Sequence, residues 1–381
     1  MENPKIRFKG FTKDWEQRKL GDEAEEILAG GDIDKEKAVD DGVYPIYANA
    51  LTNDGIVGYY DDYYRVKAPA VTVTGRGEVG RARARMIDFT PVVRLLAVRS
   101  NHDCYFLENA INNHKVVVES TGVPQLTVPQ LSSYDICFPK DIVEEKKIGT
   151  YFNQLDRLIT LHQRKCEQTK KLKKYMLQKM FPQNGAKVPE IRFDGFTYDW
   201  EQRKFSELYA RSSEKNDGSI GMDKNITVAT MQFKNDVKVS TTEYLKTYYT
   251  FKLGDIAFEG HQSKEFRYGR FVENDIGNGI VSHIFAVFRP IQEYDLYFWK
   301  YAINNETLMQ RILARSTKAS TMMHDLVTND FLNETFLVPS VKEQKQIGVF
   351  LNKLDNLITL HQRKCDELKK MKKYMLQNMF I

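Results

Sequence analysis

The feature that most constrains the fold is an internal repeat. Residues 4–20 read PKIRFKGFTKDWEQRKL and residues 189–205 read PEIRFDGFTYDWEQRKF, so 13 of 17 positions are identical. Residues 144–181 and 343–380 are also equivalent and share 26 of 38 positions. A repeat on this scale predicts two equivalent structural units in a chain of 381 residues, which is longer than one typical core supports.

The two halves have kept their ends and changed their middles. A weaker likeness between residues 105–113 (YFLENAINN) and 297–305 (YFWKYAINN), with six of nine positions identical, lies inside otherwise diverged sequence. Common ends suit a common scaffold or partner, whereas different middles suit two different ligands of one general kind. Drift after a recent duplication explains the likeness but not why the changes are confined to the middles.

Residues 144–181 and 343–380 are predicted to form long helices. Their apolar residues recur at steps of mostly three and four, and neither segment contains proline. This pattern is typical of a coiled-coil seam. Nearly 40 residues at 1.5 Å each give a rod of roughly 60 Å.

The numbering also predicts how these helices meet. Equivalent helices of a duplicated chain can pack antiparallel about a pseudo-two-fold axis, and full overlap places His162 opposite His361. No disulfide is expected, because the two cysteines of the seam then lie on opposite sides of the axis. The same register pairs Ile148 with Met375, Phe152 with Met371, Leu155 with Leu368, Thr169 with Leu354, Leu172 with Leu351, Met176 with Ile347, Cys166 with Leu357 and Cys365 with Leu158. A register shifted by one heptad stays open as the alternative, because it would keep most of the apolar contacts.

The diverged middles are predicted to be mixed α/β structure, which places the chain in the α+β class. Short runs rich in β-branched residues indicate strands, and the two YF…AINN segments indicate short amphipathic helices. The expected strands are 70–74, 93–98, 254–258 and 284–288, and the expected helices are 105–113 and 297–305.

Residues 75–80 (GRGEVG) match the pattern G-x-G-x-x-G and follow a predicted strand. A dinucleotide site would require a helix next and an acidic residue about 20 positions later. Instead the chain continues with Arg81, Arg83 and Arg85 in alternation, as on one face of a strand. We therefore interpret the segment as a tight hairpin whose glycines let the backbone approach another molecule closely.

The candidate binding residues are mostly basic or polar. Residues 65–99 hold eight Lys or Arg residues against two acidic ones, although the net charge of the whole chain is only +5. Arginine suits phosphates and guanine edges, whereas the alternative interpretation is a solvated strand face. The candidates in the first half are Arg65, Lys67, Arg76, Arg81, Arg83, Arg85, Gln125 and Thr127. Those in the second half are His261, Gln262, Lys264, Arg267, Arg270, Thr317 and Lys318, with Arg315 as a further loop candidate.

The sequence lacks motifs for catalysis, metal binding and membrane insertion. It contains no G-x-x-x-x-G-K-[ST], H-E-x-x-H or G-x-S-x-G pattern, and no Asn-Pro-Pro-aromatic or Asp-Pro-Pro-aromatic motif of an adenine methyltransferase. The four scattered cysteines suggest reduced thiols in a cytoplasm rather than disulfides or a zinc site. No stretch resembles a signal peptide or a membrane span. We therefore expect a cytoplasmic protein with no catalytic site, cofactor or metal of its own.

Taken together, these motifs resemble the specificity subunits of Type I restriction–modification enzymes. The resemblance rests on the repeated IRF-x-GF-T-x-DWEQRK motif, the LDxLITLHQRK helices, the helix start PSVKEQKQI at residues 339–347 and the Val-Pro-Gln-Leu segment at residues 123–126. It covers essentially the whole chain. In the first copy Glu144-Glu145 replaces Glu343-Gln344, and the second half lacks a Val-Pro-Gln-Leu counterpart after Thr317, which puts its recognition loop in doubt.

The resemblance implies a division of labour along the chain. Residues 1–141 would be a first target recognition domain, and residues 182–340 would be a linker and a second such domain. Each would bind one half of a bipartite site in double-stranded DNA. The long helices, residues 142–181 and 341–381, would space these domains and dock two methyltransferase (modification) subunits, with restriction subunits in the full complex.

Two other interpretations stay open from the residues alone. A self-contained DNA adenine methyltransferase with fused recognition arms would bind S-adenosylmethionine directly. A coiled-coil scaffold with two protein-binding heads would not show the salt-dependent binding of duplex DNA expected of the assembled recognition complex.

Overall fold

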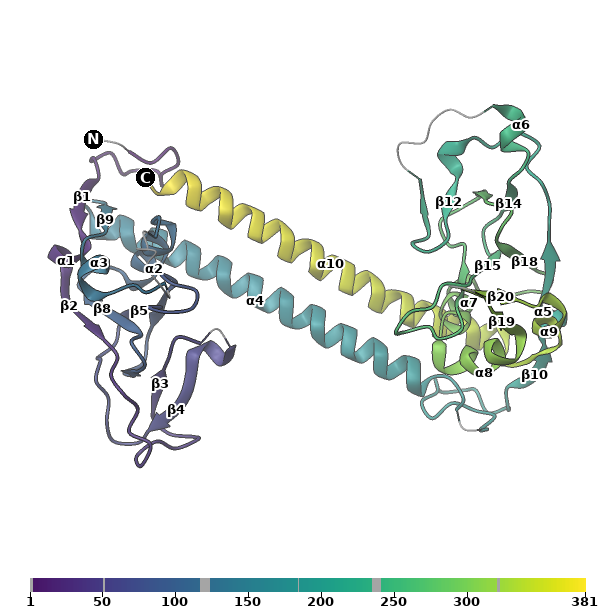
Figure 1. The fold of residues 1–381 in the computed structure, drawn as a ribbon, viewed down its shortest axis with the longest axis horizontal. Coiled ribbons are helices and arrows are strands. Elements are labelled where there is room, and N and C mark those ends of the chain that lie inside the picture. Colours follow the sequence, from purple (N-terminus) through teal and green to yellow (C-terminus); the bar gives the residue numbers. More distant parts are fainter. Residues whose placement is uncertain (1–2, 51, 117–123, 184, 235–240, 321–322) are drawn as a thin grey trace. The chain divides into compact units, whose positions relative to one another are not determined.

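The computed structural model describes residues 3–50, 52–116, 124–183, 185–234, 241–320 and 323–381. The chain divides into two compact units, one formed by residues 1–164 with 361–381 and the other by residues 165–360. Each unit combines one of the diverged middles with the first part of one long helix and the last part of the other (Figure 1). Helices and sheets are mixed in both units, which confirms the predicted α+β class and the internal repeat.

The first unit is built on a four-stranded antiparallel sheet in the order β2-β8-β5-β6. Its strands are β2 (Ala24–Ala29), β8 (Leu96–Ser100), β5 (Ala70–Val73) and β6 (Ala82–Arg85). The other strands form the sheet β4-β3-β7 (Ile56–Tyr60, Tyr44–Tyr47 and Thr90–Pro91) and the pair β1-β9 (Glu16–Lys19 and Asp135–Phe138). The short helices are α1 (Leu20–Glu23), η1 (Thr52–Gly55), α2 (Cys104–Asn113) and α3 (Val128–Ser132).

The second unit repeats this plan with the sheet β11-β18-β15-β16. Its strands are β11 (Tyr209–Ser212), β18 (Ala286–Pro290), β15 (Ile256–Glu259) and β16 (Arg270–Glu273). Strand pairs are β10-β21 (Glu201–Lys204 and Thr335–Val338), β12-β13 (Ile226–Thr227 and Gln232–Phe233), β14-β17 (Tyr249–Phe251 and Gly279–Val281) and β19-β20 (Thr317–Ala319 and His324–Leu326). The short helices are α5 (Phe205–Leu208), η2 (Met222–Lys224), α6 (Thr242–Leu245), α7 (Leu296–Ile303), α8 (Glu306–Ser316) and α9 (Thr328–Asn333).

An aromatic cluster explains why the repeated motifs have kept their tryptophan. Trp15 packs edge-on against Phe106 of α2 and Phe380 at the end of the last helix, with ring centroids 5.8 and 6.4 Å apart. Burying aromatic rings in this way contributes much of the stability of a small core. The matching contacts in the second unit join Trp200, Phe298 and Phe181.

A buried ion pair explains the repeated arginine. The guanidinium of Arg7 binds both carboxylate oxygens of Glu144 in the first turn of α4, at 2.6 and 2.9 Å, and this carboxylate is almost fully buried. Removing one partner of such a pair would leave a buried charge uncompensated, so both residues must be kept together. The equivalent pair in the second unit is Arg192 with Glu343, at 2.7 and 2.8 Å.

The long helices α4 (Ile142–Lys179) and α10 (Val341–Met379) pack antiparallel within each unit. In the first unit the Nδ1 atoms of His162 and His361 lie 3.0 Å apart, and Lys372 binds Asp156 at 2.7 Å. Residue numbers therefore rise along one helix as they fall along the other, and the predicted pairing of the two histidines is confirmed. Lys173 and Asp355 make the equivalent contact in the second unit, at 2.6 Å.

The predicted seam is wrong at one position in each helix. Leu172 and Met371 are 40% and 47% exposed. Their places are taken by Lys173 and Lys372, which bind the aspartates of the opposing helix. Strict alternation of four and three beyond Cys166 leads to the lysine rather than to the neighbouring apolar residue. The two apolar side chains therefore lie on the surface of the helix pair and not in its seam.

The predicted environment of the seam cysteines is also wrong in detail. Leu158 and Leu357, which were expected to face the cysteines, are each 43% exposed. The Sγ atom of Cys166 lies instead 3.9 Å from the carbonyl oxygen of Ile358. Cys104, Cys137, Cys166 and Cys365, all within the described residues, form no disulfide with one another.

Three of the four expected strands begin later than the sequence indicated. Val93 and Arg94 have φ angles of 51° and 62°, which a strand does not allow, and β8 begins at Leu96. In the second unit β15 begins after Gly254, whose φ is +86°. The expected helices at residues 105–113 and 297–305 form as α2 and α7, each with an aspartate at its N-cap.

Candidate nucleic-acid interface

The glycine-rich segment of the first unit is a hairpin between β5 and β6, as predicted. The Thr74 N–H donates to the carbonyl oxygen of Arg81 at 3.0 Å, and the Gly80 N–H donates to that of Thr74 at 2.8 Å. Gly77 and Gly80 have φ angles of +74° and +84°, which favour glycine. A Cβ atom on Gly77 would meet nothing within 4 Å, so the tip of the hairpin is open to another molecule.

Arg83 and Arg85 lie in β6 and Arg81 immediately precedes it, with all three side chains on one side, as the alternation predicted. All three line a pocket of about 90 Å³ together with Asp54. The side chains of Arg81 and Arg83 are 60% and 57% exposed. Arg85 is only 8% exposed and lies over the ring of Tyr47 at 3.7 Å. Two of the three arginines can therefore reach a ligand directly, and the third supports them.

A second segment runs beside the hairpin. Arg76 forms an isolated antiparallel bridge with Gln125, and the Leu126 N–H donates to the carbonyl oxygen of Gly75 at 2.9 Å. The Oε1 atom of Gln125 accepts from Arg94 at 3.1 Å and weakly from Arg76 at 3.4 Å. The structure thus brings these polar residues together, although Val123, the first residue of the Val-Pro-Gln-Leu segment, lies outside the described residues.

Three other candidates of the first half lie elsewhere. Thr127 is the N-cap of α3 and forms a capping box with Gln130, which is a structural role. Lys67 lines a different pocket, with Arg99 and Lys146. Arg65 is exposed, and its backbone N–H donates to the carbonyl oxygen of Phe89.

The second unit has a counterpart of this arrangement, which the sequence left in doubt. The His324 N–H donates to the carbonyl oxygen of Gly260 at 2.8 Å, and His261 bridges Met323. These are the contacts that Leu126 and Gln125 make in the first unit. The segment expected after Thr317 therefore exists as β19-β20, but its sequence is not Val-Pro-Gln-Leu.

The polar candidates of the second unit gather around His324. Its Nε2 atom lies 2.6 Å from Nε2 of Gln262, and its Nδ1 atom lies 3.3 Å from the hydroxyl of Thr317. The ring of Tyr268 packs edge-on against it. Sequence reasoning missed His324, because no motif or spacing distinguishes it.

The basic candidates of the second unit are partly engaged in ion pairs. Arg270 binds Glu259 at 2.8 Å, and Arg315 binds Glu334 with its Nε atom at 2.7 Å. Lys264, Arg267 and Lys318 are exposed, and so is His261.

The register relates the two interfaces residue by residue. Gly75 and Gly260 make equivalent backbone contacts, so Arg81 of the first unit corresponds to Arg270 of the second. An independent anchor agrees, because Asn112 donates to the carbonyl oxygen of Ala82 and its counterpart Asn304 to that of Phe271, both at 3.0 Å. By the same register Arg83 and Arg85 correspond to Val272 and Asn274.

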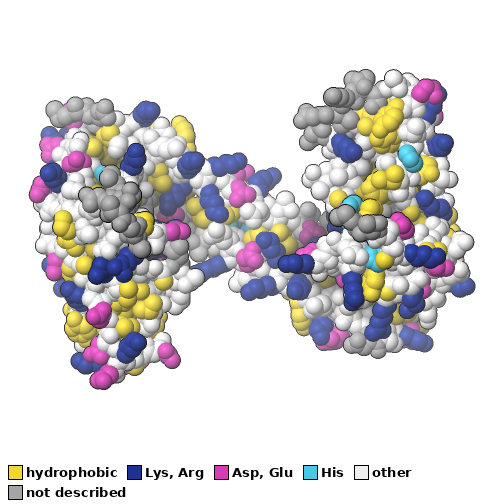
Figure 2. Space-filling model, viewed as in Figure 1, with side chains coloured by type: hydrophobic (Ala, Val, Ile, Leu, Met, Phe, Trp, Pro, Cys, Tyr) yellow, Lys and Arg dark blue, Asp and Glu magenta, His cyan; other side chains and the backbone are white. Residues whose placement is uncertain are grey.

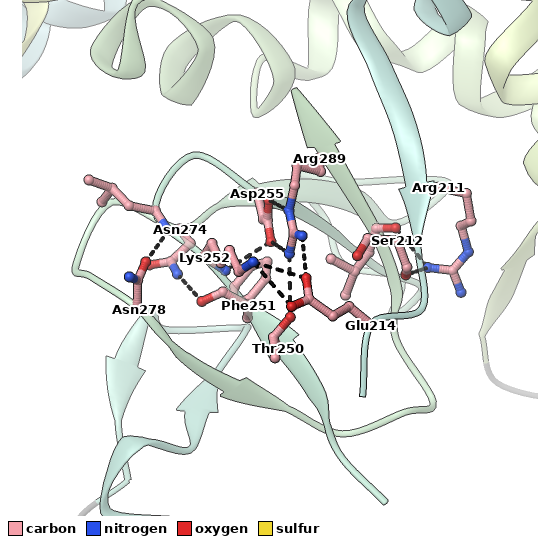
Figure 3. A network of polar contacts seen from close by, with 12 residues as sticks. Arg211, Ser212, Glu214, Thr250, Phe251, Lys252, Asp255, Asn274, Asn278 and Arg289 are labelled. Atoms are coloured by element: carbon pink, nitrogen blue, oxygen red, sulfur yellow. Dashed lines mark hydrogen bonds and ion pairs between the residues drawn. The ribbon is translucent and has the colours of Figure 1, made fainter. Parts of the chain in front are cut away.

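A charged network in the second unit is satisfied internally (Figure 3). Arg289 binds both carboxylate oxygens of the buried Asp255, at 3.0 and 2.9 Å, and also contacts Glu214. Hydrogen bonds from Arg289 and Lys252 lower the pKa of Glu214 to about 2. The amide of Asn274 donates to the carbonyl oxygen of Phe251 at 2.8 Å. These residues hold β14 to the sheet, and their polar groups bind one another, so they are not candidates for ligand binding.

The exposed surface of the long helices carries the same apolar residues twice. The first unit exposes Leu158 and Leu161 of α4 with Met371 and Tyr374 of α10. In the second unit the equivalent residues are Leu357 and Leu360 of α10 with Leu172 and Tyr175 of α4, also exposed. Lys and Arg side chains surround apolar patches on this part of the surface (Figure 2). Exposed apolar patches rimmed by charge are typical of protein interfaces.

Within the described ranges, no group of three or more His, Cys, Asp or Glu side chains is placed to hold a metal ion. A search of the same ranges finds no helix with the length and hydropathy needed to cross a membrane.

The two equivalent units define a class of repeat-built proteins in which each unit carries a polar hairpin at the same edge of its sheet. The chain belongs to the family described as "Type I restriction modification DNA specificity domain", which it matches over residues 12–171 and 198–370. It is 33% identical over 129 residues to a putative type I specificity subunit of Mycoplasma pneumoniae, a match that covers 32% of this chain and 34% of that relative. The match thus spans about a third of the relative's length.

The fold is also similar to that of a solved structure. The crystal structure of a Type-I restriction-modification system S subunit from M. genitalium superposes with a TM-score of 0.67 over 100% of this chain and 99% of that chain, at 15% identity.

Proposed function

We propose that this chain is the DNA sequence-specificity subunit of a Type I restriction–modification complex, working in the cytoplasm without a catalytic site of its own. The observation that carries the proposal is that both units present a polar hairpin or loop at the same sheet edge, on equivalent supporting contacts but with different exposed residues. Equivalent supports suit one kind of ligand, duplex DNA. Different exposed residues suit two different half-sites, because base edges rather than phosphates carry sequence information.

The proposed division of the chain follows the repeat. Residues 1–141 and 182–340 would contain the two target recognition domains, each binding one half of a bipartite DNA site. Residues 142–181 and 341–381 would space them. Arg76, Arg81, Arg83, His261, Lys264, Arg267 and Lys318 would contact DNA in the two domains, with Gln125 and Gln262 beside them.

The long helices are proposed to dock two methyltransferase subunits, and restriction subunits would join in the full complex. The support is the duplicated apolar set, Leu158 and Leu161 with Met371 and Tyr374, and its equivalent in the second unit. Two equivalent exposed sets suit two copies of one partner. Adenine methylation would belong to that partner, because no methyltransferase motif occurs in this sequence.

A domain exchange tests the proposed function. Residues 20–141 would be replaced by the corresponding segment of another specificity subunit, and the chain would be expressed with its modification subunits. Methylated adenines would then be mapped across the host genome. We expect one half of the methylated sequence to change and the other to stay. A change in both halves, or none, would contradict the modular reading of DNA.

A further inference from the structure

We propose that Arg83 reads a base in the first half-site, that this base is a guanine, and that Asp54 is the residue that positions Arg83. The inference rests on the proposed DNA-reading function and adds to it a specificity-determining residue and the chemistry of its target. It uses contacts within the first unit together with the register that relates the two units.

Equivalent positions of the two units differ in which residues they share. Arg81 and Arg270 are arginines at the same place in the two sheets, whereas Arg83 corresponds to Val272. Whatever both half-sites have in common, above all the phosphate backbone, should be met by residues that both units share. Whatever distinguishes the half-sites should be met by exposed residues that differ. Arg83 is exposed and differs, so it belongs to the second group.

The guanidinium of Arg83 is held on one side by a carboxylate. Arg83 binds Oδ1 of Asp54 through its Nε atom at 2.7 Å, and its side chain is 57% exposed. Among the described residues, Asp54 is its only ion-pair partner. An arginine held at Nε can offer the N–H groups of its two Nη atoms side by side. This pair of donors matches the O6 and N7 acceptors of guanine in the major groove, the commonest specific contact of arginine.

The carboxylate of Asp54 is itself held in place by Arg85. The Oδ2 atom of Asp54 binds Arg85 at 2.7 Å, and its backbone carbonyl accepts from the same guanidinium at 3.0 Å. Arg85 is fixed in turn by the hydroxyl of Thr72 at 3.0 Å and by the ring of Tyr47. The buried Arg85 thus holds Asp54 in place, and the Oδ1 atom of Asp54 contacts Arg83.

A plain surface ion pair would have a different design. Exposed pairs between long, mobile side chains contribute little and need no support. Here the carboxylate of Asp54 bridges two arginines. The backbone of Asp54 has a φ of 55°, in the left-handed region that aspartate tolerates better than most residues. Asp54 and Glu78, which binds Arg81, supply two negative charges against three arginines, so the site keeps a net positive charge for DNA.

The experiment uses the chain in complex with its modification subunits. Duplexes randomised at each position of the recognised sequence would be selected by binding, and the base preference would be measured position by position. We expect Arg83→Ala to lose about 5- to 150-fold of discrimination for guanine at one position of one half-site. Asp54→Asn should weaken discrimination at that same position by a smaller factor. Both should leave the other half-site unchanged, which also shows that the complex has assembled.

Arg81→Ala is the matched control, because Arg81 immediately precedes β6, lines the same pocket and has a similarly exposed side chain. It should weaken binding to all sequences alike and reduce the dependence on salt concentration by about one phosphate contact. Arg83→Lys keeps the positive charge but lacks the two parallel N–H donors of the guanidinium, so it should behave like Arg83→Ala in discrimination between bases. This variant keeps the test decisive if the alanine variant does not fold.

The outcomes separate the two proposals. If the wild-type complex shows no sequence preference, the proposed function fails. If the wild type discriminates and the Arg83 and Asp54 variants keep every preference, or lose affinity uniformly, then Arg83 does not read a base. A preference for a base other than guanine at the affected position would overturn the assignment of the target.

Discussion

His102 is held between two carboxylates of the first unit. Its Nδ1 atom lies 2.9 Å from Glu145, its Nε2 atom lies 2.9 Å from Glu23, and its ring stacks on Phe138. Both nitrogens can donate to carboxylates only when the ring is doubly protonated. Burial alone would lower the pKa of His102, but the hydrogen bonds to Glu145 and Glu23 outweigh it, so this pKa is raised above its usual 6.5.

A raised pKa predicts that the first unit loses stability as the pH rises. The contribution of His102 is fully present below the unfolded-state pKa, about 6.5, and is lost as the pH rises through the higher folded-state value. We expect hydrogen exchange of the first turns of α4, corrected for intrinsic rates, to quicken as the pH is raised from 6 to 8.5. In His102→Gln this pH dependence should disappear, with a loss of about 1–3 kcal/mol at pH 6.

The second unit provides the control for this prediction. Tyr294 stands at the position equivalent to His102, and Gln344 replaces Glu145. Tyr294→Phe should therefore leave the pH dependence of the first unit unchanged. Other charged groups near His102 include Arg18, which binds Glu23, Asp103 at the start of α2, and Arg99 and Lys146, which line a pocket with it. Persistence of the pH dependence in His102→Gln would assign it to those groups instead.

Among the elements, the long helices were the most predictable, because periodicity over nearly 40 residues averages out single exceptions. The error at Leu172 came from taking apolar character as burial, whereas the seam position is Lys173. The start of β8 was predicted too early because valine favours strands, whereas the backbone of Val93 has a left-handed conformation. The positions of Asp54 and His324 beside their arginine and glutamine partners depend on contacts across the sheet, which local sequence does not encode.

The duplicated apolar set on the helices leads to a prediction about assembly. Leu161→Glu and Leu360→Glu place a charge on an exposed position, so each should change the free energy of unfolding by no more than about 0.5 kcal/mol. Each should remove one of the two proposed docking sites. In native mass spectrometry the single variants should bind one modification subunit and the double variant none.

Val143→Glu provides a matched control on the same helix. Val143 is 50% exposed, but its counterpart in the second helix is Lys342, so it does not belong to the duplicated set. This variant should still bind two modification subunits. If it lost them as readily as Leu161→Glu, or if the double variant kept both, the duplicated set would not be the docking surface.

At the scale of the whole chain, each repeated entry motif forms a hydrogen bond to the end of a long helix. In the second unit the Ile191 N–H donates to the carbonyl oxygen of Lys179 at the end of α4. In the first unit the Ile6 N–H makes the same 2.9 Å hydrogen bond to the carbonyl oxygen of Asn378 at the end of α10. The sequence showed that these segments are equivalent, but not that residues near opposite ends of the chain would meet in the way that neighbouring segments meet at residues 179–191.

These equivalent hydrogen bonds predict that a circularly permuted chain will fold and function. In the second unit seven residues separate Phe181 from Pro189, and joining residue 381 to residue 1 would place four residues between Phe380 and Pro4. Three inserted Gly or Ser residues therefore reproduce the natural length, and new termini can be opened between Gly185 and Ala186, which are exposed. We expect this permutant to assemble with the modification subunits and to methylate the same sequence as the native chain, because the opening lies outside the sheets, the long helices and the buried cores of both units. A permutant with the same junction but opened within α4, between Asp156 and Arg157, should fail, because it interrupts the helix where Asp156 binds Lys372. Loss of assembly in the first permutant, with the native chain active beside it, would show that the direction of the chain through the two units matters as well as their contacts.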